Sequence, residues 1–181
     1  MEVIMRKELL IGSGARLKKQ LHLPDHKDWS NLVTLDINEE HKADVIHDLN
    51  VLPYPFKDNE FDEIHAYDVL EHTGKQGDFK FFFGQWSEFW RILKPDGHFF
   101  AKCPSYTSRW AWGDPSHTRI IQPESLVFLK QTEYTTQVGK SPMSDFRNIY
   151  KADFEEEYIK FDEDDFFFVM RAVKPSRIKY V

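Results

Sequence analysis

The chain is poor in cysteine and carries no long hydrophobic run. Its single cysteine, Cys103, excludes an intrachain disulfide, and without a CxxC pair it offers no cysteine-based zinc site. No apolar run approaches the ~20 residues that span a bilayer. The N-terminal residues also lack a signal-peptide pattern. We therefore expect a soluble, cytoplasmic protein with no membrane partner and no bound metal.

The chain also lacks an excess of basic residues. Its 181 residues include 24 Lys and Arg against 30 Asp and Glu, which gives a formal net charge of -6. This balance carries no strong nucleic-acid signal, although a local basic patch is compatible with it. Repeats, low-complexity tracts and Ser/Gly linkers are absent, so we expect a single domain over residues 1–181.

Short hydrophobic runs alternate with turn residues along the chain. Seven of them predict strands, at residues 8–11, 31–36, 44–47, 61–66, 98–102, 146–150 and 166–173. Helices are predicted at 16–21, at 79–93 with Asp78 as N-cap, and from Pro123. We expect the acidic stretch between the last two strands to be a solvated connection. The alternation predicts the α/β class: a Rossmann-like, doubly wound, seven-stranded sheet, mostly parallel, with an antiparallel edge hairpin.

The ends of the first four predicted strands suit an adenosine-containing cofactor, because ligands of such sheets bind beyond the carboxyl ends of the strands. Residues 12–14, Gly-Ser-Gly, form a loop that a ligand can approach closely. Asp36 follows 24 residues after Gly12, near the spacing of an acid that binds ribose hydroxyls. Asp48 offers a carboxylate for an exocyclic amine. Each feature alone is compatible with a simple turn or strand-end cap, whereas their order is much more specific.

The same segments resemble a known family. The runs LIGSG (10–14), LDI (35–37), VIHDLN (45–50), LPYPFKDNEFDEI (52–64), VLEH (69–72) and WRILKPDG (90–97) are similar to class I S-adenosylmethionine-dependent methyltransferases. They match the small methyltransferase-domain, or type 11, subgroup, and the resemblance covers roughly residues 8–130. It implies S-adenosylmethionine as cofactor and S-adenosylhomocysteine as product.

The resemblance also implies which residues surround the cofactor. The glycine loop would pass its methionine part, the acid after the second strand would bind the ribose diol, and the acid after the third would accept from the adenine amine. The residues after the fourth strand would line the transferable methyl. These cofactor-binding residues are Gly12, Ser13, Gly14, Asp36, Ile37, Asp48, Leu49, Tyr67 and Asp68.

Two positions depart from the family pattern. Leu10 stands where many members carry an acid, and Arg16 stands where a third glycine is common. The lost acid would weaken the grip on the ammonium of the cofactor, unless another carboxylate such as Asp68 substitutes. The departures keep a second interpretation open: a catalytically weak or inactive methyltransferase-like module that serves as a binding domain or a subunit.

Catalytic candidates lie after the fourth and fifth predicted strands. Methyl transfer is an in-line displacement that needs a general base only when the acceptor must lose a proton. The candidates are His117, His72 and Tyr106. Each histidine has an ordinary alternative: His72 can be a satisfied residue at a helix start, and His117 a loop residue bonded to backbone.

The loop from residue 103 to residue 121 should face the methyl acceptor. Aromatic residues are interleaved there with basic ones, including Arg109, Trp110, Trp112 and Arg119, so the loop can stack a planar acceptor and pair with an anionic group. Alternatively, the two tryptophans fold back as a hydrophobic lid. We expect a small-molecule acceptor, aromatic or anionic, with a nucleotide or RNA acceptor as the alternative. The sequence leaves homo-oligomerisation open.

Overall fold

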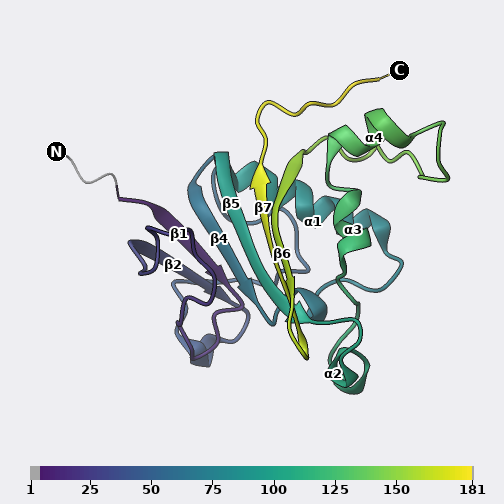
Figure 1. Ribbon diagram of the computed structural model, residues 1–181. Helices are drawn as coiled ribbons and strands as arrows, with labels where there is room; N and C mark the ends of the chain where they lie inside the picture. The colour runs from purple at the N-terminus through teal and green to yellow at the C-terminus, as the bar shows by residue number, and fades with distance from the viewer. Residues whose placement is uncertain (1–4, 181) are drawn as a thin grey trace.

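A seven-stranded sheet organises the fold. In the computed structural model, which describes residues 5–180, the strand order is β3-β2-β1-β4-β5-β7-β6 (Figure 1). The strands are β1 (Lys7–Ile11), β2 (Asn31–Asp36), β3 (Val45–Ile46), β4 (Phe61–Tyr67), β5 (Leu93–Pro104), β6 (Phe154–Phe161) and β7 (Asp165–Ala172). The first five pair in parallel, and β7 runs antiparallel to both β5 and β6. The predicted fold class is confirmed.

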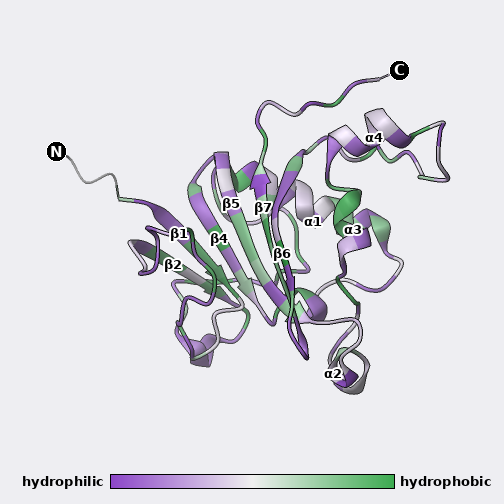
Figure 2. Ribbon diagram, in the orientation of Figure 1, coloured by the Kyte–Doolittle hydropathy of each residue, from purple (hydrophilic) through white to green (hydrophobic). Residues whose placement is uncertain are grey.

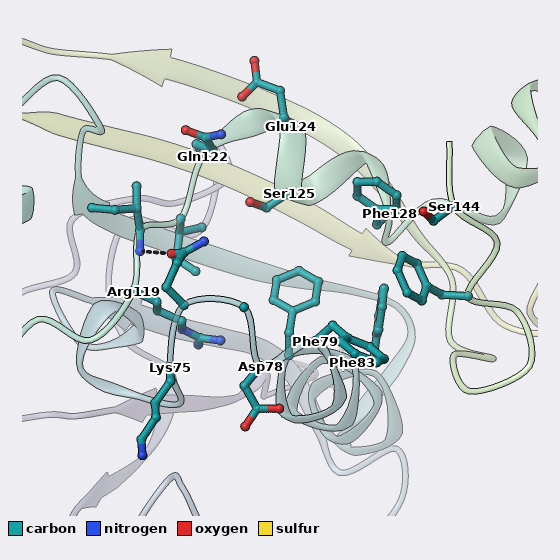
Figure 3. A pocket seen from close by; sticks show the side chains of 16 residues that line it. Lys75, Asp78, Phe79, Phe83, Arg119, Gln122, Glu124, Ser125, Phe128 and Ser144 are labelled. Carbon is teal, nitrogen blue, oxygen red and sulfur yellow. Dashed lines mark hydrogen bonds between the residues drawn. The ribbon is translucent and has the colours of Figure 1, made fainter. Parts of the chain in front are cut away.

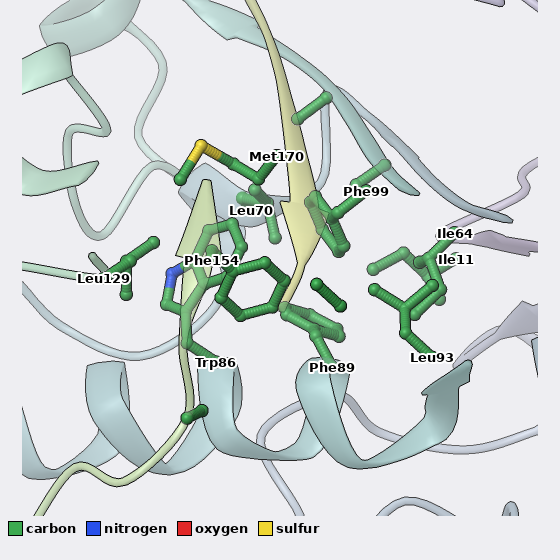
Figure 4. Packing of buried hydrophobic residues seen from close by; sticks show 14 of the residues in the cluster. Ile11, Ile64, Leu70, Trp86, Phe89, Leu93, Phe99, Leu129, Phe154 and Met170 are labelled. Atoms are coloured by element: carbon green, nitrogen blue, oxygen red, sulfur yellow. The ribbon is translucent and has the colours of Figure 1, made fainter. Parts of the chain in front are cut away.

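One helix packs along one face of this sheet. Helix α1 (Phe79–Ile92) begins at Asp78, whose side chain accepts a hydrogen bond from the backbone N of Phe81 at 3.0 Å, as the N-cap prediction requires. Trp86 and Phe89 project from α1 onto Phe99 of the sheet, with ring centroids 4.9 and 4.6 Å away (Figure 4). The aromatic stripe of the helix therefore forms the core.

The remaining helical segments are short. They are the 3₁₀ turns η1 (Glu39–His41) and η2 (Leu70–His72) and the helices α2 (Arg109–Gly113), α3 (Pro123–Val127) and α4 (Gln131–Gln137). The helix expected from Pro123 is confirmed as α3, whereas α4 was not predicted. No helix among residues 5–180 has the length and apolarity that crossing a bilayer requires.

The helix predicted at residues 16–21 is wrong, because this segment follows an irregular path across the opposite face of the sheet. Along that path Lys19 contacts Glu8 and Glu63 at 2.6 and 2.8 Å, and Trp29 packs edge-on against His65 at 4.8 Å. A six-residue segment without a cap has little helical stability of its own. These tertiary contacts therefore decide its conformation.

The late part of the chain also departs from the prediction. Residues 146–150 form a turn rather than a strand, and Tyr150 within it is buried against Phe83 of α1. The acidic stretch is instead part of β6, an edge strand. Its acids pair outward, Glu157 with Arg171 and Glu155 with the guanidinium of Arg177, each at 2.7 Å. Charged side chains protect an edge strand from further pairing.

The topology brings five strand ends to one edge of the sheet. Because β1 to β5 are parallel, the loops that follow them leave from that edge, and α2 lies there after β5 (Figure 1). Figure 2 shows hydrophobic residues gathered along the strands and hydrophilic residues in the connecting loops. A ligand that contacts several loops at once must therefore bind at this edge.

Candidate functional site

The glycine loop after β1 lies across the ends of two neighbouring strands. Gly12 and Gly14 have positive φ values of 59° and 53°, and a Cβ at Gly12 would overlap the side chain of Val69. The backbone N of Ser13 donates to the carbonyl of Leu35 at 3.2 Å. Glycine at position 12 is thus required both by the left-handed backbone and by the close approach of the segment after β4.

Asp36 at the end of β2 holds a fixed carboxylate beside this loop. It accepts hydrogen bonds from the backbone N of Gly14 and of Asn38, both at 2.8 Å, and lies 3.2 Å from His41 Nδ1. Burial alone would raise the pKa of Asp36, but the two backbone hydrogen bonds and His41 hold it below its usual value. Ile37, next along the chain, is exposed. An ionised acid therefore stands where the sequence predicts the ribose-binding residue.

The segment after β3 provides a second acid and an apolar neighbour. Asp48 Oδ1 accepts from the backbone N and side chain of Asn50 at 2.8 and 2.9 Å, which leaves Oδ2 to accept from a ligand. Leu49 is buried, and its carbonyl accepts from the hydroxyl of Tyr54 at 3.1 Å. This arrangement suits a flat ring that needs both an acceptor and an apolar surface.

Two predicted cofactor residues after β4 are engaged elsewhere. The hydroxyl of Tyr67 lies 2.7 Å from His65 and accepts from the backbone N of Leu21 at 3.1 Å, and burial raises the pKa of Tyr67 to about 12. Asp68 has a positive φ of 53° and an ion pair with Lys102 at 2.6 Å. The carboxylate predicted to replace the acid missing at position 10 is thus already paired with a lysine.

A second group of titratable side chains gathers after β4. Glu71 and His72 of η2 meet His117 of the loop after β5, and ligand atoms of the three side chains lie within 4.8 Å of one another. The two imidazole rings are 4.7 Å apart, edge to face. The backbone N of Thr118 donates to the carbonyl of Glu71 at 2.8 Å, which fixes the loop against η2. The structure therefore brings two of the predicted catalytic residues together.

Glu71 is the most perturbed acid of this group. It is 3% exposed, and neither carboxylate oxygen has a hydrogen-bond partner among residues 5–180. Burial raises the pKa of Glu71 to about 8. The Nδ1 atom of His117 is likewise buried without a partner among the described residues.

Arg119 is buried in the protein and is not exposed on the loop after β5. It donates to the carbonyl of Leu70 at 2.9 Å and to Thr73 Oγ1 at 2.8 Å, and it also bonds Gln85. Burial lowers the pKa of Arg119 to about 10. Its role in this structure is to hold η2 and the middle of α1 together.

Among residues 5–180, Tyr106 makes no hydrogen bond or ring contact with His72 or His117. Its ring packs edge-on against Phe161, with the ring centroids 6.0 Å apart. Helix α2 exposes Trp110 and Trp112 by 53% and 74%, so in this structure they do not close as a lid. Cys103 is buried, and burial raises the pKa of its thiol well above its ordinary value. A reactive thiolate is therefore disfavoured at this position.

A cavity of about 410 Å³ opens beside the N-terminus of α1 (Figure 3). One wall is aromatic, and polar groups line the rim. The aromatic residues are Phe79, Phe82, Phe83, Phe128 and Phe146, and the charged ones are Lys75, Asp78, Arg119 and Glu124. The size and lining suit a small molecule with an aromatic ring.

Comparison with known proteins connects these features. A profile of the methyltransferase-domain family matches residues 10–101, which include the glycine loop, Asp36, Asp48 and α1. The chain belongs to this methyltransferase family. S-adenosylmethionine is the cofactor of the family, and the predicted resemblance is confirmed. Among curated protein sequences, none matches the chain.

Solved methyltransferase structures share the fold of this methyltransferase. An S-adenosylmethionine-dependent methyltransferase of Archaeoglobus fulgidus has a TM-score of 0.58 at 18% identity, over 92% of this chain and 86% of that one. One of Methanosarcina mazei has a TM-score of 0.54 at 14% identity, over 93% of both chains. The N-methyltransferase NodS of Bradyrhizobium japonicum has a TM-score of 0.53 at 14% identity, over 94% and 87%. At these low identities, the structural likeness shows the shared fold alone.

The residues of this methyltransferase fit the nucleoside part of the cofactor better than its amino-acid part. Asp36 and Asp48 offer carboxylates at the positions predicted for ribose and adenine, and the backbone at Gly12 leaves no room for a side chain. Leu10, however, is buried and apolar, and Asp68 is paired with Lys102. An ammonium group that bound at Asp68 would therefore have to compete with Lys102 for the carboxylate.

Sequence reasoning missed Glu71 as a member of the site. The signal was present, because Glu71 and His72 are adjacent residues directly after a strand end. Their convergence with His117 depends on the backbone contact of Thr118 with Glu71, which joins segments 47 residues apart. No local pattern reports such a contact.

Proposed function

We propose that the protein transfers a methyl group from S-adenosylmethionine, by in-line displacement, to a small aromatic acceptor. The observation that carries this proposal is the 2.8 Å bond from the backbone N of Gly14 to the ionised Asp36 carboxylate, within the segment that matches the methyltransferase family. It joins the loop and the acid that this cofactor needs at one place on the sheet edge. The aromatic cavity beside α1 supports an aromatic acceptor.

The residues divide the work along the sheet edge. Asp36 would bind the ribose diol, and Asp48 would accept from the adenine amine. When bound, the cofactor supplies an activated methyl group and leaves as a neutral thioether. His72 lies beside Glu71 after β4, His117 meets them from the loop after β5, and in the metal-free protein any of the three could accept an acceptor proton. The chain itself then has only to align the acceptor atom with the methyl carbon and exclude water.

Titration calorimetry with S-adenosylhomocysteine tests the cofactor half of this proposal. We expect saturable binding by the wild-type chain and its loss in Asp36→Ala. Glu39→Ala is the matched control, because Glu39 is an exposed acid in the same loop, three residues further along. If the wild-type chain fails to bind at millimolar S-adenosylhomocysteine, the enzyme proposal is wrong and the binding-module interpretation takes its place.

A nucleotide acceptor is a second candidate, favoured by one observation. Helix α2 exposes Trp110 and Trp112, and the guanidinium of Arg109 lies 5.2 Å from the ring of Trp110. Exposed aromatic rings beside a cation can stack nucleobases. Binding of a short single-stranded RNA that weakens in Trp112→Ala and with added salt would favour this acceptor. Salt-insensitive or undetectable binding would leave the small aromatic molecule as the acceptor.

A further inference from the structure

We propose that Glu71, His72 and His117 form a binding site for a divalent transition-metal cation at the acceptor side of this fold. The three side chains offer one carboxylate and two imidazoles, a donor set typical of Zn²⁺, Fe²⁺ and Mn²⁺ sites with open positions. The sequence predicted no metal, because its single cysteine offers no cysteine-based zinc site. The three ligands come instead from two segments that meet only in the fold.

The spacing of the ligand atoms suits one ion. They lie within 4.8 Å of one another. Bonds from zinc to nitrogen or oxygen are about 2.0–2.2 Å long, so two ligands of one ion lie at most ~4.4 Å apart. A contraction of less than about 1 Å, within reach of side-chain rotation, therefore closes the site. His72 is exposed, which leaves one side open to a further ligand.

An oxygen lies near one ring nitrogen of each histidine, within hydrogen-bond distance for His72 and just beyond it for His117. His72 Nδ1 lies 3.3 Å from the carbonyl of Ser116, and His117 Nε2 lies 3.8 Å from the carboxylate of Asp114. These contacts leave His72 Nε2 and His117 Nδ1 for a cation. Oxygen acceptors on the second nitrogen are the usual support of metal-binding histidines, because they fix both the tautomer and the ring orientation.

The strongest observation is that Glu71 is buried with nothing to bind. Neither of its oxygens, nor Nδ1 of His117, has a hydrogen-bond partner among residues 5–180. Buried polar atoms nearly always find partners. The void lined by Glu71, Cys103 and His117 is too small for a water molecule, so no water in this void can donate a hydrogen bond to the carboxylate of Glu71. A cation on the open side would satisfy all three atoms at once.

The other cluster of buried acids already contains a cationic side chain. Glu8, Glu63 and His65 also lie within ligand distance of one another, but Lys19 Nζ already contacts both acids at 2.6 and 2.8 Å. An ammonium group thus occupies the place that a metal would take. The carboxylate of Glu71, in contrast, has no cationic side chain in hydrogen-bond contact among residues 5–180.

The cation would serve the acceptor. Gly12 of the cofactor loop packs against Val69, two residues before Glu71, so the site lies beside the place of the transferable methyl. A divalent cation lowers the pKa of a hydroxyl that it binds. This inference rests on the proposed function and favours an acceptor with a hydroxyl group. The proton of that hydroxyl passes to solvent before the oxygen attacks the methyl carbon. The carbon–sulfur electron pair stays on sulfur.

Calorimetric titration of the chelator-treated full chain with Zn²⁺, and separately with Mn²⁺, tests the site without cofactor or acceptor. We expect one ion per chain, with affinity reduced at least about 100-fold in Glu71→Gln and in His72→Ala. His72 is exposed, so His72→Ala keeps the test decisive if Glu71→Gln folds poorly. His22→Ala, at an exposed histidine distant in sequence, is the matched control and should bind as the wild type does.

The outcomes separate the proposals. Unchanged affinity in both Glu71→Gln and His72→Ala would overturn the metal site, and so would the absence of binding by the wild-type chain. Metal binding by a chain that does not bind S-adenosylhomocysteine would retain the site and remove the methyltransferase proposal. Cofactor binding without metal binding would do the reverse.

Discussion

Two clusters with buried acids differ in how those acids are paired. In the first cluster, Glu8, Glu63 and His65, the acids have hydrogen-bonded partners; in the second, Glu71, His72 and His117, the acid has none among residues 5–180. Glu63 of the first contacts Lys19, His26 and His65, and its pKa is lowered although burial opposes ionisation. Glu71 of the second has no partner among the described residues for its carboxylate, and burial raises its pKa to about 8. Burial raises the pKa of both acids, but only at Glu63 do hydrogen-bonded partners outweigh it.

The difference separates a structural network from a place for a ligand. A buried charge is tolerated when it is paired and hydrogen-bonded, as in the first cluster. A buried carboxylate without partners costs stability, and such costs are typical of functional sites. The first cluster holds the irregular segment at residues 12–30 against the sheet, on the face opposite α1. The second lies at the sheet edge where ligands of this fold bind.

The largest expected effect is the loss of Lys19 from the first cluster. Lys19→Met leaves Glu8 and Glu63 facing each other without the ammonium that lies between them. Breaking a buried ion pair costs about 3–5 kcal/mol, so we expect the free energy of unfolding to fall by that amount in urea. Lys18→Met, at an exposed neighbour, should change it by less than about 0.5 kcal/mol. Equal effects of the two variants would show that the first cluster is not a network.

Lys19 also shows where sequence reasoning fails. The periodicity at residues 16–21 favours a helix, but the gain from placing Lys19 between two buried acids comes from β1 and β4 and is invisible locally. In the same way, Tyr150 packs on α1 and prevents the predicted strand at residues 146–150. Strands β1 to β5 were predictable because they are short apolar runs bounded by turn residues, and α1 was predictable because burial of one face fixes its pattern.

The candidate site likewise contains residues that the local sequence pattern predicts and contacts that it does not. The strand ends at Gly12, Asp36 and Asp48 were found because each directly follows a predictable strand, and their roles toward the cofactor stay predictions. His72 and His117 were found as separate residues. Their meeting with Glu71 could not be found, because it depends on the path of the long loop after β5.

The second cluster should respond to a cation as the first does not. A ligand that binds only the folded state at 100 times its Kd stabilises it by about 2.7 kcal/mol. We expect Zn²⁺ at that excess to raise the unfolding free energy of the wild type by about this amount and that of Glu71→Gln by much less. Urea unfolding with and without Zn²⁺ measures both. An equal rise in the two proteins would place the cation elsewhere.

Support of His117 by Asp114 provides a finer test of the second cluster. Asp114 lies 3.8 Å from His117 Nε2 and does not belong to the ligand set. We expect Asp114→Asn to lower Zn²⁺ affinity about 10–100-fold, which is the usual cost of losing such a partner. Titration calorimetry measures it, and Asp145→Asn, an acid in the loop after α4, is the control. Unchanged affinity in Asp114→Asn would mean that the carboxylate does not orient this ring.

The first cluster should also make the protein sensitive to acid. Burial lowers the pKa of His65, so folding opposes its protonation, and stability falls as pH drops below the unfolded value of about 6.5. The lowered pKa of Glu63 adds a loss below its unfolded value of about 4.3. Each proton contributes at most about 1.4 kcal/mol per pH unit. Urea unfolding between pH 7 and pH 4 should show this slope, and His65→Gln should flatten it between pH 6.5 and 5.

The smallest expected effect completes the comparison. In metal-free protein, Glu71→Gln removes a carboxylate that has no hydrogen bond to lose among residues 5–180. We therefore expect the free energy of unfolding at pH 7 to change by less than about 1 kcal/mol. Glu63→Gln, in contrast, weakens the bonds to Lys19 and His65 and should cost more. An acid that serves a ligand should be dispensable to folding until the ligand is present. A larger loss of stability in Glu71→Gln than in Glu63→Gln would therefore mean that Glu71 stabilises the fold instead.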